Sequence, residues 1–147
     1  MTTETTTLTV LLEEDLDYLQ LRLNDAGSVL HEEFTTVKEE YFKFMILLFQ
    51  NRHRIIGMYS DKVDALWHQH MLHSRKYYEF CMTHFEEYIH HDPAPYPYVE
   101  QEVQQRIQGF EFFKALYEEQ FGDINPVWGR QNPAMCCGHH HDGLILL

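Results

Sequence analysis

The chain has few basic residues for its length, and this shortage excludes one large class of partner. Eleven Lys and Arg stand against 23 Asp and Glu in 147 residues, which gives a formal net charge of −12. Nucleic-acid binding depends on cationic side chains that neutralise phosphates, so we expect no nucleic-acid partner. A chain of this charge attracts cations or basic partners instead.

Other absences narrow the class of protein further. No apolar run approaches the length of a membrane span, and the N-terminal MTTETTTLTV lacks the basic segment of a secretory signal. The three cysteines, Cys81, Cys136 and Cys137, form a poor disulfide framework because their number is odd and two are adjacent. The chain also lacks a Gly-rich phosphate loop, a nucleophile elbow and an internal repeat. We therefore expect a cytoplasmic protein with reduced thiols and no membrane partner.

What is present favours helices. Hydrophobic residues make up 44% of the chain, enough for one domain with a proper core. Leucines at helical spacing predict a first helix that stops at residues 24–27. A second helix is expected over about residues 31–52, and a last one over about residues 100–121, ended by Gly122. The predicted buried stripe of the second helix is Val37, Tyr41, Phe44, Met45 and Leu48.

Two shorter helices are expected between these. Ser60 or Asp61 caps the first of them, and a bend near His73, with Ser74 as a second N-cap, separates it from the next. Prolines in residues 92–97 then impose an extended loop. The predicted fold class is all-α: a single-domain irregular bundle of about five helices, with a Pro-rich loop and an extended C-terminal tail. Residues 1–125 form the helical domain, and residues 126–147 form a tail that contains Cys and His.

Histidine is the strongest chemical signal in the chain. Six of the eleven histidines lie within residues 63–93, beside an aspartate at position 64. Imidazole is a common ligand of zinc, copper, iron and nickel. This density predicts a transition-metal site, with iron or zinc expected before copper or nickel. The candidate ligands are Asp64, His68, His70, His73, His90 and His91.

Helical geometry limits which of these side chains can share one metal. Each residue turns about 100° around a helix, so two half-sites result on different faces. Asp64 and His68 form one of them, and His70 and His73 form the other. The sequence does not choose between them.

The histidine pair before Asp92 can reach such a site only if the chain turns back. On one straight helix, His90 would lie about 33 Å from His68. With a turn, Asp64, His68 and His91 form a set of two histidines and one carboxylate. This set suits iron(II) with open positions, or zinc with a bound water. Sites richer in histidine favour zinc, copper or nickel.

Each of these residues also has a structural interpretation. A carboxylate is favourable in the first turn of a helix, and a histidine is favourable at a helix end. Trp67 and His68 can be a core pair. In the tail, a cluster can bind zinc or copper, or complete the central site. Its members are Cys136, Cys137, His139, His140 and His141.

Several residues together resemble the core of the glycine-rich domain-containing protein-like family. They are Val63, Asp64, Trp67, His68, His70, Leu72, Tyr77, Cys81, Phe85, His90 and His91. The resemblance covers roughly residues 35–125 and implies a fold and a site more than a reaction. Glu86 stands where that family has glycine, and His73 stands where it often has Asp. The glycine-rich and RNA-binding segments of its larger members are absent.

Three functions follow as hypotheses. The first is a metal-dependent oxygenase or hydrolase that acts on a small molecule or modified peptide, in which Tyr77 or Glu79 assists proton transfer. The second is a non-enzymatic acidic interaction domain, in which the histidines are structural. The third is metal storage or trafficking through the tail. The sequence does not indicate the oligomeric state.

Overall fold

The computed structural model describes residues 7–54, 56–91 and 100–129, and for residues 100–108 it describes the backbone alone. These residues form six α-helices and two short 3-10 helices, without a strand among them. The all-α prediction is therefore confirmed. The elements are α1 (Leu8–Leu11), η1 (Asp17–Leu19), α2 (Gln20–Asp25), η2 (His31–Glu33), α3 (Phe34–Gln50), α4 (Asp61–Leu72), α5 (Ser74–Phe85) and α6 (Glu100–Phe121).

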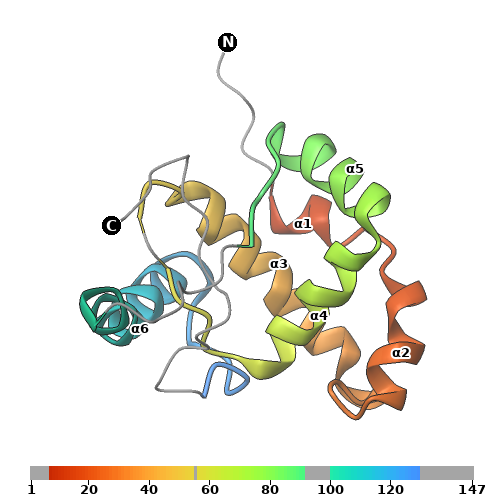
Figure 1. The fold of residues 1–147 in the computed structure, drawn as a ribbon, viewed down its shortest axis with the longest axis horizontal. Coiled ribbons are helices and arrows are strands. Elements are labelled where there is room, and N and C mark those ends of the chain that lie inside the picture. The colour runs from red at the N-terminus through yellow and green to blue at the C-terminus, as the bar shows by residue number, and fades with distance from the viewer. Residues whose placement is uncertain (1–6, 55, 92–99, 130–147) are drawn as a thin grey trace.

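Helix α3 lies at the centre of the molecule and contacts α1, α4 and α6 (Figure 1). Its predicted stripe is buried, and so are neighbours on its other faces, including Phe42, Ile46 and Leu47. Between Tyr41 and Leu48 only Lys43 is polar, and a helix segment that is apolar nearly all round must be covered on several sides. Helices α1, α4 and α6 supply this cover, while α2 and α5 contact α4. No described helix is long and apolar enough to span a bilayer.

The N-terminal region differs from the single helix that its leucines predict. It is divided into α1, η1 and α2, although Leu16, Leu19 and Leu23 are all buried. The break falls at an acidic stretch, where the Asp15 carboxylate accepts a hydrogen bond from the Asp17 backbone N–H at 2.9 Å. Such a side-chain bond offers the backbone an alternative to helix. Leu12, the first leucine of the predicted pattern, is 40% exposed, so short turns bury only the remaining three.

The limits of α4 agree with the prediction, and those of α5 differ in one detail. The Ser60 hydroxyl caps α4 by accepting from the Val63 N–H at 3.2 Å. The bend falls at His73, whose backbone is non-helical. Ser74 is the first residue of α5 and not its cap, because His73 occupies the N-cap position without a side-chain hydrogen bond. The predicted Pro-rich loop and the tail from residue 130 onward lie outside the described residues.

A buried carboxylate attaches α6 to α3. Glu40 is 1% exposed and accepts hydrogen bonds from the Tyr117 hydroxyl at 2.7 Å and from Trp128 Nε1 at 3.3 Å. Lys43 Nζ lies 3.2 Å from the same carboxylate. A buried charge is stable only when it is paired and hydrogen-bonded. Glu40 meets this condition through three groups, two of which come from α6 and the segment that follows it.

Replacing Glu40 with Ala should therefore destabilise the protein strongly. The substitution leaves the buried Tyr117 hydroxyl and the Trp128 indole N–H without their acceptor and removes the charge partner of the partly exposed Lys43, at a cost of about 3 kcal/mol of unfolding free energy. Glu119→Ala, on the exposed surface of α6, is the matched control and should change stability by less than about 0.5 kcal/mol. Urea unfolding measures both. Equal midpoints for the two variants would contradict this role of Glu40.

Candidate metal centre

Helix α4 supplies two of the side chains at the candidate site. Asp64 lies in its first turn, where a carboxylate is favourable against the helix dipole. His68 follows one turn later on the same face, as expected for residues four apart. Its Nε2 lies 3.3 Å from Asp64 Oδ1.

The third side chain arrives on a segment that reverses the chain after α5. We call residues 86–91 the His91 arm. It starts at Glu86, which has a left-handed backbone with φ of 56°, an unusual conformation for a residue other than glycine. The arm then runs back toward α4 (Figure 1). At its end, His91 Nε2 lies 3.2 Å from Asp64 Oδ1.

Asp64, His68 and His91 thus form a group that can hold a metal ion, with one donor atom from each within 4.8 Å of the others. Ligands at about 2.1 Å from a metal lie about 3.0 Å apart at right angles and about 3.4 Å apart at a tetrahedral angle. The two distances to the carboxylate oxygen fall between these values. Metal binding therefore requires no large movement of the carboxylate relative to either imidazole.

The site is enclosed on one side and open on the other. The side chains of Asp64 and His91 are 12% and 4% exposed, whereas that of His68 is 43% exposed. The Trp67 ring packs against the His91 ring with centroids 4.0 Å apart. Solvent can therefore reach this group from the side of His68.

The electrostatics favour the neutral imidazole that a metal needs. Burial, and to a smaller extent the nearby His91, lowers the pKa of His68, while Asp64 opposes this shift. Without a metal, the carboxylate oxygen can accept a hydrogen bond from an imidazole N–H. A metal binds an imidazole nitrogen that carries no proton, so its affinity should fall in acid.

The other predicted ligands lie elsewhere. His70 is buried among aromatic rings, and its Nδ1 lies 2.7 Å from the Tyr41 hydroxyl. Nδ1 of His73 donates to the Gln69 carbonyl oxygen at 2.9 Å. His90 packs edge-on against Tyr88. None of the three belongs to the group around Asp64, and among the described residues no second group of this kind is found.

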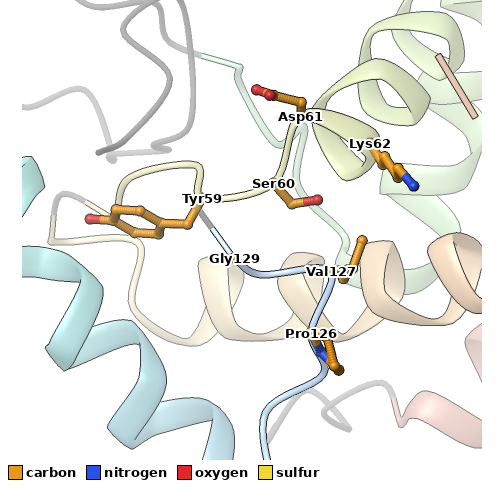
Figure 2. A pocket seen from close by; sticks show the side chains of 7 residues that line it. All are labelled: Tyr59, Ser60, Asp61, Lys62, Pro126, Val127 and Gly129. Carbon is orange, nitrogen blue, oxygen red and sulfur yellow. The ribbon is translucent and has the colours of Figure 1, made fainter. Parts of the chain in front are cut away.

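Neither of two hollows on the described surface is lined by Asp64, His68 or His91. The first has a volume of about 370 Å³ and lies between the start of α4 and the segment after α6. Figure 2 shows Ser60 beside the segment that carries Pro126 and Val127, with the Asp61 side chain directed away from that segment. The second, of about 350 Å³, lies between the segment after α1 and α5, and Glu79 is among its lining residues. Glu79 therefore lies in a different hollow and not at the metal group.

Sequence reasoning missed the role of Tyr77. Its hydroxyl is fully buried, accepts from Trp67 Nε1 at 3.1 Å and donates to the Ile89 carbonyl oxygen at 2.5 Å. These two hydrogen bonds show that the Tyr77 hydroxyl holds other groups in place rather than transferring a proton. Helical spacing predicts that Tyr77 is buried, but no sequence signal indicates a hydrogen bond to a backbone carbonyl twelve residues later.

The environment of His70 generates a prediction about pH. Burial, with a smaller effect of His73, lowers the pKa of His70 to about 3. An unfolded histidine takes up its proton near pH 6.5. Between these values the unfolded chain binds more protons, so stability should fall as pH falls, by up to about 1.4 kcal/mol per pH unit.

Urea unfolding at pH 7.0, 5.5 and 4.5 tests this dependence in the wild type and in His70→Gln. The variant should lose less stability on acidification, whatever its stability at pH 7.0, because its side chain does not titrate. The same loss in both proteins would contradict the assignment of this pH dependence to His70.

Comparison with known proteins gives a family. The model of the UCP032817-like family matches residues 17–126, a stretch that includes all three ligands of the candidate site. The description of this family names no reaction and no ligand. No curated protein and no solved structure matched the chain.

The match corrects the resemblance drawn from the sequence. The matching family is not the glycine-rich domain-containing protein-like family, and nothing in the comparisons indicates that family. A few Trp, His and Phe residues at helical spacing are too few to separate one helical family from another. Over residues 17–126, most of its length, the chain belongs to the UCP032817-like family.

Proposed function

We propose that the protein is a metal-dependent enzyme that binds one divalent transition metal through Asp64, His68 and His91. The observation that carries this proposal is the convergence of two imidazoles on one carboxylate oxygen, at 3.2 and 3.3 Å, from segments far apart in the chain. Three protein ligands leave coordination positions open, which is a feature of catalytic rather than purely structural sites. The acidic chain, with a net charge of −12, also attracts cations.

The identity of the metal decides the reaction class. Iron(II) held by two histidines and one carboxylate supports oxygenase chemistry at its open positions. Zinc in the same ligands supports hydrolysis, because it lowers the pKa of a bound water to about 7. In either case the exposed side of His68 is where a small molecule or a modified peptide would approach. A cytoplasmic location, inferred from the sequence, is part of this proposal.

The two alternatives from the sequence make different predictions about metal. An acidic interaction domain requires none. A storage or trafficking protein would hold metal through Cys136, Cys137 and the three histidines that follow, which lie outside the described residues. Substitutions at the Asp64 group would then leave the metal content unchanged.

Metal analysis of full-length protein purified without an affinity tag tests the proposal. After anaerobic reconstitution with iron(II), or with zinc, the wild type should hold about one equivalent of one metal. Separate Asp64→Ala, His68→Ala and His91→Ala variants should each lose at least about tenfold in affinity, because each removes a ligand. The preferred metal then selects between oxygenase and hydrolase assays.

His90→Ala is the matched control, because it removes an imidazole from the residue next to His91 without touching the group. It should bind metal like the wild type. A variant with His139, His140 and His141 all changed to Ala should also bind normally. A wild type that holds less than about a tenth of an equivalent would end the proposal, and loss of metal only in the tail variant would favour storage.

A further inference from the structure

The position of His91 depends on how the His91 arm is held against α4. The arm crosses from the end of α5 to Asp64, and His91 is its last residue. Near its start, Glu87 pairs with Arg52 at 3.5 Å, but both side chains are about one-third exposed. Exposed ion pairs of this kind contribute little. The arm therefore needs a firmer attachment closer to His91.

Tyr77 on α5 provides such an attachment. Its hydroxyl donates to the carbonyl oxygen of Ile89, two residues before His91. Tyr77 and Ile89 are both completely buried. Burial raises the pKa of Tyr77 well above its ordinary value, so the hydroxyl keeps its proton and remains a donor. A buried carbonyl that lost this donor would be left unsatisfied, which favours the attached position strongly.

The Tyr77 hydroxyl also makes a hydrogen bond to the residue whose ring packs against His91. It accepts a hydrogen bond from Trp67 Nε1 at 3.1 Å, which orients the indole ring. That ring is the one that packs against the His91 imidazole. One oxygen atom therefore fixes both the backbone before His91 and the surface on which its ring rests.

We propose that Tyr77 is a positioning residue for the metal centre, whose hydroxyl holds His91 at Asp64 through the Ile89 carbonyl and the Trp67 indole. This inference rests on the proposed function. It follows the general behaviour of metal sites, in which the loss of a group that orients a ligand typically costs about 10- to 100-fold in metal affinity. Tyr77 does not touch the metal in this account.

The chain offers a closely matched control in Tyr41. Its hydroxyl is also completely buried and also makes a hydrogen bond, to His70 Nδ1 at 2.7 Å. Both tyrosine rings stack near Phe80. His70 is outside the metal group. Tyr77→Phe and Tyr41→Phe therefore remove the same kind of interaction from the same core, but only the first removes a contact with the His91 arm.

The experiment compares cobalt(II) binding by full-length wild type, Tyr77→Phe and Tyr41→Phe, together with their melting temperatures without metal. Both variants should melt at reduced temperatures, and Tyr77→Phe at the lower one, because the Tyr77 hydroxyl makes two hydrogen bonds and the Tyr41 hydroxyl makes one. Tyr77→Phe should bind cobalt about 10- to 100-fold more weakly and change its visible spectrum, whereas Tyr41→Phe should differ from the wild type by less than about twofold. Equal cobalt affinities and spectra in the two variants would overturn the inference.

A second measurement separates this inference from the proposed function. In metal-free protein, the NMR signals of the His91 ring should shift in Tyr77→Phe and stay unchanged in Tyr41→Phe. Unshifted signals in Tyr77→Phe overturn the positioning role whatever the metal result. A wild type that fails to bind cobalt, with His91 signals that do shift, overturns the metal centre and leaves Tyr77 as the residue that places the arm.

Discussion

One carboxylate oxygen lies where two distant parts of the chain meet. Oδ1 of Asp64 lies beside an imidazole from its own helix and beside a second one 27 residues along the chain. A carboxylate that is almost buried is costly unless charge or hydrogen bonds compensate it. After α5 the chain reverses and brings the His91 imidazole to this carboxylate. The rest of the His91 arm keeps His91 in that position. A bound cation would compensate the charge of the Asp64 carboxylate in the same way.

The aromatic core makes this arrangement rigid. Trp67, Tyr77 and Ile89 are completely buried, and one phenol hydroxyl connects the other two. Because close-packed interiors respond to small changes in shape, the positions of these groups are tightly coupled. The site is therefore closed by close packing on the side of Trp67 and exposed to solvent on the side of His68. A catalytic metal needs both properties.

Much of this arrangement could be predicted from the sequence. The Ser60 cap, the bend at His73 and the extent of α6 follow from local rules that do not depend on distant contacts. Helical rotation also separates His68 from His70, and the structure has the first beside Asp64 and the second in the core. Local spacing alone does not say which of the two faces meets His91.

What could not be predicted depends on tertiary contacts or on unusual backbone. The leucine pattern of the N-terminal region fits one helix equally well, and only the packing of α1 onto α3 and of η1 and α2 onto α4 shows that short turns take its place. The reversal after α5 uses a left-handed backbone, a conformation typical of glycine, yet the residue that adopts it is Glu86. Nothing in the sequence indicates the hydrogen bond from the Tyr77 hydroxyl to the Ile89 carbonyl oxygen. These are the features on which the position of His91 depends.

X-ray absorption spectroscopy of the metal-loaded, full-length protein tests the central claim most directly, because it reports the atoms bound to the metal. The account predicts two imidazole nitrogens with oxygen ligands, all at about 2.0–2.2 Å, and no sulfur. A sulfur ligand at about 2.3 Å, or a coordination sphere without imidazole, would show that the metal is bound elsewhere.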